Sequence, residues 1–327
     1  MKFINVTTLA AVALVALGAG SAFAQEREQM VESIHFLIPG GAGGGWDGTA
    51  RGVGEALKES GLVETVTFEN MSGAGGGKAL NYIVENAASN AGTLMVHSTP
   101  IIVRALNKTV DMGFRDVTPV AGVIGDFAAI VVGKDSEFES WEQLYAAYQD
   151  NPSGVAIGGG STPGSMDHLV PASIVQEAGS DPLDMRYVAY DAGGTAMAGL
   201  LSGEIAALST GLSEAIALAD AGEVRILAVT APERVDAAPD VPTFKELGVD
   251  IEFVNWRGFF AAPGLPEDQR AAYADVLREM TTTDAWAAVR DRNGWIDIFN
   301  SGEDFSAYLT NQEAEMQELM TSMGFIQ

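Results

Sequence analysis

Glycines are concentrated in one stretch of the chain where backbone N–H groups are positioned to bind an anion. Six of the nine residues from Gly40 to Gly48 are glycine. An apolar segment precedes this stretch and an amphipathic helix follows it, so its N–H groups lie at the positive end of a helix dipole. Such a loop favours a bound carboxylate or phosphate. Asp47 stands where the N-cap of the helix is expected.

Three more glycine-rich loops have the same setting, between a strand signal and a helix signal. They are SGAGGGKA (Ser72–Ala79), GGGSTPGSMDHL (Gly158–Leu169) and YDAGGTA (Tyr190–Ala196). Loops at the carboxyl ends of neighbouring parallel strands face a common crevice. Two early and two mid-chain loops therefore predict two lobes that enclose one polar ligand.

A dinucleotide site is an alternative reading of the first loop. Gly43, Gly45 and Gly48 match G-x-G-x-x-G, and Glu69 ends the next strand about 20 residues later, as in a dinucleotide fingerprint. The loop from Pro39 to the first matching glycine is too long for the tight turn of that motif. An exported α/β oxidoreductase nevertheless stays open as an alternative.

Other catalytic motifs are absent from the sequence. Ser72 and Ala79 occupy positions where a phosphate-binding loop requires Gly and Ser or Thr, and Ser161 lacks the glycine of a nucleophile elbow. There is no cysteine, and the histidines lack metal-ligand spacing: His35, His97 and His168. His168 is a candidate to bind a ligand because it lies next to a hydroxyl-rich loop. We expect no metal, no cofactor and no enzymatic activity.

The elements that would position these loops alternate between strand and helix along nearly the whole chain. This alternation predicts an α/β fold with mainly parallel sheets. The expected strands include IHFLIP, VTFEN, TLMVHS, GVAIGG, MRYVAY, EIAALST and VRILAVT. The expected helices include 49–60, 79–87, 196–201, 213–221 and, after Pro266, three pieces of which the last is 301–323.

The first 24 residues read as a secretory signal peptide. Lys2 precedes the apolar run Leu9–Ala19, and the small residues of Ser21–Ala24 predict cleavage near Ala24–Gln25. The mature protein is then expected in the periplasm. No later segment is long and apolar enough to suggest a membrane span.

The charge of the chain is strongly negative. Of its 327 residues, 18 are Lys or Arg and 44 are Asp or Glu, for a formal net charge of −26. Nucleic acids and anionic membrane surfaces would be repelled, so we expect neither as a partner. An anionic ligand would have to be attracted by local donors.

The motifs, taken in order, resemble those of the substrate-binding proteins of tripartite tricarboxylate transporters. The resemblance covers essentially the whole mature chain. Two departures are Pro171, within the helix expected after His168, and Asp191, an acid not expected in a carboxylate receptor. The matching segments are PGGAGGGWD, ENMSGAGGGKA, GSMDHL, YDAGGTAMAGLLSGEIAAL, AVTAPERVDAAPDVPTFKELG and NWRGFFAAPGLPEDQ.

The resemblance implies a two-lobed, periplasmic-binding-protein-like fold with two chain crossings, near 120–132 and 251–260. Lobe 1 would contain residues 25–125 and 253–327, and lobe 2 residues 126–252. Closure about the crossings would trap the ligand.

The implied function is that of a monomeric receptor which delivers a small, citrate-like di- or tricarboxylate to a two-component membrane permease. A ligand sensor for a signalling partner is a further alternative. The residues expected to bind the ligand are Gly40, Gly41, Ala42, Gly43, Gly44, Gly45, Trp46, Asp47, Gly73, Ala74, Gly75, Ser98, Thr99, Ser161, Thr162, Ser165, His168, Gly193 and Arg257.

Overall fold

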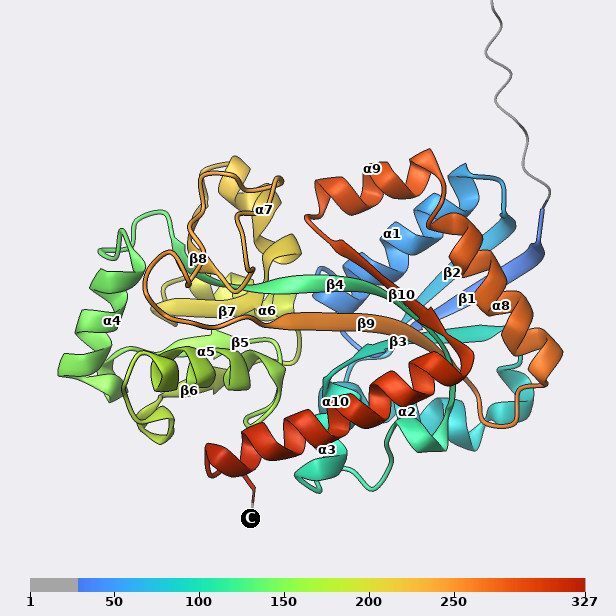
Figure 1. Ribbon diagram of the computed structural model, residues 1–327, viewed down its shortest axis with the longest axis horizontal. Coiled ribbons are helices and arrows are strands. Elements are labelled where there is room, and N and C mark those ends of the chain that lie inside the picture. Colours follow the sequence, from blue (N-terminus) through green and yellow to red (C-terminus); the bar gives the residue numbers. More distant parts are fainter. Residues whose placement is uncertain (1–28, 327) are drawn as a thin grey trace, which may run out of the picture.

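Two α/β lobes joined by two long strands make up the computed structural model, which describes residues 29–326 (Figure 1). The joining strands are β4 (Thr118–Gly133) and β9 (Val254–Ala261), which lie at the two expected crossings. The expected two-lobed fold class is confirmed. The predicted signal peptide lies outside the described residues.

Lobe 1 is built on one end of the sheet, in the strand order β2-β1-β3-β9-β4, with β10 paired to β4. Its remaining strands are β1 (Val31–Ile38), β2 (Val63–Asn70), β3 (Thr93–Ser98) and β10 (Ile296–Ser301). One face packs on α1 (Gly45–Glu59), α8 (Glu267–Met280) and α9 (Asp284–Arg292). The other packs on α2 (Gly77–Glu85), α3 (Pro100–Leu106) and α10 (Gly302–Ser322).

Lobe 2 continues the sheet from β4 in the order β7-β5-β6, and β8 also pairs with β4. Its strands are β5 (Ile157–Gly159), β6 (Tyr187–Ala189), β7 (Ala207–Gly211) and β8 (Val224–Val229). One core packs on α4 (Trp141–Asp150) and α5 (Met166–Glu177). The other packs on α6 (Gly193–Leu201) and α7 (Leu212–Asp220).

The sheet is mixed, although mainly parallel sheets were expected. Strand β1 runs parallel to β2 and β3, and β5 runs parallel to β6 and β7. Every pairing of β4 and β9 is antiparallel. The reason is that the chain enters lobe 2 along β4 and returns along β9, so adjacent crossings must run in opposite directions.

Most expected elements are present, with small changes at their ends. Strand β3 has the expected bounds, and three helices follow Pro266 as predicted. Strand β10 was not expected, because the polar residues in its sequence IDIFNS weaken the strand signal. Most of its residues are only half-buried in the structure. Pro171 lies inside α5 and removes the N–H that would bond the carbonyl of Asp167.

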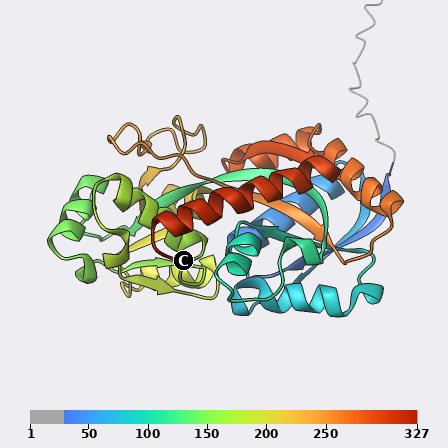
Figure 2. The same cartoon turned by 60° about the horizontal axis from the view of Figure 1, so that its bottom comes forward.

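Helix α10 starts in lobe 1 and reaches lobe 2, where its end packs on α5 (Figure 2). The ring of Phe325 meets the edge of His168 with centroids 4.8 Å apart, and Ser173 Oγ lies 3.9 Å from Met323 Sδ. The lobes are therefore in contact at this helix as well as along the two strands. In the part of the chain that the structure describes, no helix has the length and apolarity needed to cross a membrane.

Candidate ligand-binding site

A cavity lies between the two lobes, at the carboxyl ends of the parallel strands. Its volume is about 60 Å³, which is space for several waters or a small solute. Its walls are Gly40, Gly41, Gly44, Gly45, Trp46, Ser98, Pro100, Gly160, Ser161, Met166, Asp167, Asp191, Ala192, Gly193, Glu214, Asn255 and Arg257.

The glycines of the first loop lie where the backbones of the two lobes meet. A Cβ added to Gly44 would be 3.3 Å from the backbone nitrogen of Gly193 in lobe 2. A Cβ on Gly194 would be 2.7 Å from the carbonyl oxygen of Ala42 in lobe 1. Side chains at these positions would hold the lobes apart, so the glycines permit closure.

Asp47 shapes the first loop and does not line the cavity. Its carboxylate accepts hydrogen bonds from the Gly43 N–H at 3.0 Å and from Asn70 Nδ2 at 3.0 Å. Asn70 also donates to the carbonyl of Gly40, and Arg51 pairs with Asp47 at 2.9 Å. The Gly43 N–H therefore already has an acceptor within the protein, and these hydrogen bonds hold the loop in one conformation.

Two helices present N–H groups at the cavity. Helix α1 begins at Gly45 and α6 begins at Gly193, and both residues line the cavity. The N–H groups of Gly44, Gly45 and Gly193 have no acceptor among the described residues. Because the positive ends of two helix dipoles meet here, these N–H groups are suited to an anion.

Strand β9 places two polar side chains at the cavity through its alternation. Asn255 and Arg257 face the cavity, while Trp256 between them is buried in the core of lobe 1. On the neighbouring strand β3, Ser98 pairs in register with Arg257. Trp46 Nε1 donates to Ser98 Oγ at 2.9 Å, which fixes the indole as a wall of the cavity.

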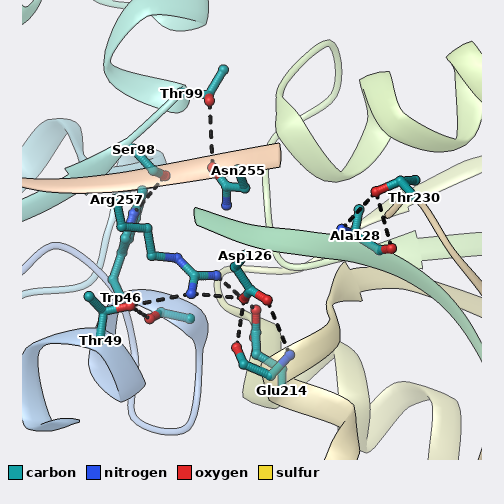
Figure 3. A network of polar contacts seen from close by, with 12 residues as sticks. Trp46, Thr49, Ser98, Thr99, Asp126, Ala128, Glu214, Thr230, Asn255 and Arg257 are labelled. Carbon is teal, nitrogen blue, oxygen red and sulfur yellow. Dashed lines mark hydrogen bonds and ion pairs between the residues drawn. The ribbon is translucent and has the colours of Figure 1, made fainter. Parts of the chain in front are cut away.

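Arg257 is buried in an ion pair (Figure 3). Its side chain is 2% exposed, and Nη1 lies 2.9 Å from Oδ2 of Asp126, which is fully buried. Nη1 also donates to Thr49 Oγ1 at 3.3 Å, and the hydroxyl of Ser213 donates to Asp126 at 2.6 Å. Arg257 Nε has no partner among the described residues. The guanidinium thus borders the cavity with its charge already matched.

Three carboxylates line the cavity, and Asp126 is not among them: Asp167, Asp191 and Glu214. Burial raises the pKa of Glu214 to about 7, against the favourable charge of Arg257 and with the help of Asp167 and Asp126. Burial also raises the pKa of Asp167 to about 6, although Gly160, Arg257 and Ser161 favour its charged form. Asp191 is exposed at the cavity's edge.

Of the hydroxyl groups expected to bind the ligand, some line the cavity and others lie outside its lining. Ser98 and Ser161 line the cavity, and Ser161 Oγ also accepts the N–H of Asp167 at 2.9 Å. Thr99 lies 3.5 Å from Asn255 Oδ1, outside the lining. The hydroxyls of Thr162 and Ser165 are buried without a partner among the described residues, and they do not line the cavity either.

The second glycine loop borders the cleft beside the cavity. Gly73, Ala74 and Gly75 all have positive φ and do not line the cavity. The carbonyl of Gly75 accepts a hydrogen bond from the buried Arg104 at 2.6 Å. A Cβ on Gly75 would be 3.2 Å from the methyl group of Thr162, so this loop contacts lobe 2.

The two buried histidines support the loops and lie outside the cavity lining. Burial lowers the pKa of His97 to about 3 and that of His168 to about 4, so both are neutral. His97 packs on Trp46 with centroids 4.7 Å apart. His168 stacks on Tyr187 and accepts the N–H of Gly164 at 3.0 Å, which holds the hydroxyl-rich loop.

The expected ligand residues therefore fall into two groups. Nine line the cavity: Gly40, Gly41, Gly44, Gly45, Trp46, Ser98, Ser161, Gly193 and Arg257. Ten lie around it: Ala42, Gly43, Asp47, Gly73, Ala74, Gly75, Thr99, Thr162, Ser165 and His168. The lining residues not predicted as ligand contacts are Pro100, Gly160, Met166, Asp167, Asp191, Ala192, Glu214 and Asn255.

Some of these additional lining residues could have been predicted from the sequence. Asn255 precedes Arg257 by two positions on a strand and therefore shares its face. Asp167 and Asp191 belong to glycine-rich loops already singled out. Glu214 had no such signal, because its helix follows a strand without a glycine cluster. Within residues 29–326, no three His, Asp or Glu side chains form a group that could hold a metal.

Comparisons with known proteins agree with this architecture. Residues 49–325 match the model of the tripartite tricarboxylate transporter family receptor. A UPF0065 protein of Bordetella bronchiseptica is 28% identical over 317 residues, which cover 96% of this chain and 92% of that protein.

Two solved structures have the same fold at lower sequence identity. MatC of Rhodopseudomonas palustris, with bound malate, has a TM-score of 0.76 and 20% identity over 88% of this chain and 98% of that one. A second R. palustris protein, with adipate, has a TM-score of 0.79 and 21% identity over 90% and 97%.

Proposed function

Because the chain belongs to the tripartite tricarboxylate transporter receptor family, we propose that it captures a small di- or tricarboxylate, such as a citrate-like acid, between its lobes. The receptor class follows from the family. The ligand class is our proposal.

The observation that carries this proposal is the meeting of free N–H groups and hydroxyls at the cavity. Gly44, Gly45 and Gly193 contribute N–H groups at two helix N-termini, while Ser98 and Ser161 contribute hydroxyls. Oxygens of a carboxylate accept hydrogen bonds from such donors, and charge-assisted bonds of this kind are the stronger ones. The malate and adipate of the two similar structures are small dicarboxylates, which supports the same ligand class.

We further propose where the receptor works and with what partner. After cleavage near Ala24–Gln25, a monomer in the periplasm would deliver its ligand to a two-component permease. Lobe 1 would comprise residues 25–125 and 253–327, and lobe 2 residues 126–252. Closure of the lobes would let the permease distinguish the loaded receptor from the empty one.

Thermal-shift and calorimetric titration of the mature chain with citrate, malate, succinate, adipate and their amino analogues tests the ligand class. A member of the panel should raise the melting temperature in a concentration-dependent manner, since a ligand that binds only the folded state stabilises it. NADH is the control for the oxidoreductase alternative. Failure of every acid to bind, or tight binding of NADH, would overturn the proposal.

A further inference from the structure

The cavity holds more negative than positive side chains. Asp167, Asp191 and Glu214 line it, and Arg257 is the one cation among the described residues in its lining. The charge of Arg257 is already matched by the buried Asp126 at 2.9 Å. A plain dicarboxylate would therefore meet three acids without a free cation to balance them.

Glu214, like Asp167, is more enclosed than the exposed Asp191. Its side chain is 14% exposed, and its nearest cation is Arg257, with Nη2 at 3.7 Å from Oε1. That distance leaves the carboxylate without a close charged hydrogen bond from the arginine. Asp126 and Asp167 both act on Glu214 with like charge. The backbone N–H of Gly211 donates to this carboxylate, but no described residue gives it a close charged hydrogen bond, so a cationic group would complete its surroundings.

A second observation indicates that the cavity holds a ligand with acceptor groups. Arg257 is 2% exposed and lines the cavity, yet its Nε has no partner among the described residues. Beside the acids, the N–H groups of Gly44, Gly45 and Gly193 are also free, and a Cβ added to Gly45 would be only 2.8 Å from the Glu214 carboxylate. The cavity thus offers acceptors and donors together, which matches a molecule that carries both charges.

Resting on the carboxylate-receptor function proposed above, we infer that the ligand also carries an ammonium group, as an amino acid does. Glu214 and Asp167 accept the ammonium protons, and the glycine N–H groups with Ser98 and Ser161 hold the carboxylate. Glu214 is the specificity-determining residue, since among the described residues it has no close charged donor and its carboxylate lies beside Gly45 and Gly193. Binding removes the charge imbalance without protonating the cavity.

Matched ligand pairs that differ by one amine test this inference. L-aspartate is compared with succinate, and L-glutamate with glutarate, by calorimetric titration of the mature chain at pH 7.5. We expect the amino member of at least one pair to bind tenfold or more tightly than its partner. If the plain dicarboxylates bind tighter, the inference is wrong and the proposed function stands; if no acid binds, the proposed function itself fails.

A substitution at Glu214 should change the binding affinities of the two ligand classes in opposite directions. In Glu214→Gln the amino acid should bind at least tenfold more weakly, while the plain dicarboxylate binds equally or better because a negative charge is gone. The control is Glu233→Gln, an exposed glutamate of lobe 2 outside the lining, which should change neither affinity. Equal weakening of both ligand classes by Glu214→Gln would overturn the inference.

Proton exchange on binding provides a measurement that needs no variant. Titrations near pH 7 in buffers of different ionisation enthalpy report how many protons are taken up or released. An ammonium beside Glu214 favours the charged carboxylate, so protons should be released. Net uptake with the amino acid would show that its negative groups face the acids, and would contradict the inference.

Discussion

Arg257 and Asp126 form a buried ion pair between the two strands that cross from lobe to lobe. Arg257 lies on β9 and Asp126 on β4, with Nη1 and Oδ2 2.9 Å apart and both side chains at most 2% exposed. Asp126 also accepts a hydrogen bond from the hydroxyl of Ser213, at the start of α7 in lobe 2. The pair joins β9, β4 and α7 at the point where the lobes meet.

Removing Arg257 should destabilise the fold as well as alter the cavity. Arg257→Met leaves Asp126 buried without its counter-ion, which typically costs about 3–5 kcal/mol. Urea unfolding followed by tryptophan fluorescence measures the loss. The double variant Asp126→Asn/Arg257→Met should regain part of it, because the unpaired charge is gone. Equal stability of wild type and Arg257→Met would show that the pair contributes nothing.

Gly194→Ala should impair closure without harming the fold. The new methyl group would lie 2.7 Å from the carbonyl oxygen of Ala42 in the opposite lobe. Because Gly194 lies within α6, alanine there favours the helix by about 0.5–1 kcal/mol. We therefore expect weaker ligand binding at an unchanged or higher melting temperature.

The matched control for this change is Gly48→Ala in α1. A Cβ at Gly48 meets nothing within 4 Å, so the same chemical change in a helix has no contact to disturb. Its ligand affinity should equal that of the wild type. Loss of affinity in both variants would mean that the effect does not come from contact between the lobes.

Trp46 should report ligand binding by fluorescence. It is the one tryptophan among the described residues in the cavity lining, and its indole donates to Ser98. Trp46→Phe should abolish the ligand-dependent change in emission and lower the free energy of unfolding by about 1 kcal/mol, because the hydrogen bond to Ser98 is lost. Trp295→Phe, in the core of lobe 1, should retain the response. A response that survives Trp46→Phe would place the ligand away from the indole.

The raised pKa of Glu214 predicts a dependence of stability on pH. Its value of about 7 in the folded protein exceeds the ordinary 4.5. Between these values the folded state holds more protons at this site than the unfolded chain, so the free energy of unfolding falls as pH rises. Urea unfolding from pH 4.5 to 8 should show a shallower fall in Glu214→Gln, while Glu233→Gln follows the wild type. Identical slopes in all three proteins would contradict the assignment.

The net charge of −26 predicts a salt effect on association. A dianion is repelled at long range, and salt screens exposed charges more than those inside a closed cavity. Stopped-flow fluorescence should show an association rate that rises with salt and a dissociation rate that changes little. The rise should be smaller for L-aspartate than for succinate, since its net charge is lower. A fall in association rate with salt would mean that local positive potential outweighs the global field.

The sequence was sufficient to predict the fold class and the loops around the cavity because both depend on local patterns. Alternating strand and helix signals and glycine clusters are read within a few residues, as at β3 and at Gly40–Gly48. The partner of Arg257 could not be read in this way, because Asp126 is 131 positions earlier. The same holds for Glu214, which reaches the cavity only through the packing of α7 against β4.

The pairing of the two crossings determines how the lobes can move. Strands β4 and β9 are paired from Thr118 to Phe127, with register shifts after Pro119 and Gly122, so they form one ribbon (Figure 1). Strand β10 flanks β4 up to Gly125 and β3 flanks β9 from Arg257, so the ribbon is two-stranded only between these points, where it twists readily but resists stretching because its length is set by extended backbone. We therefore expect opening to twist this short ribbon and to separate the end of α10 from α5, so a partner that contacts both lobes would sense their relative rotation.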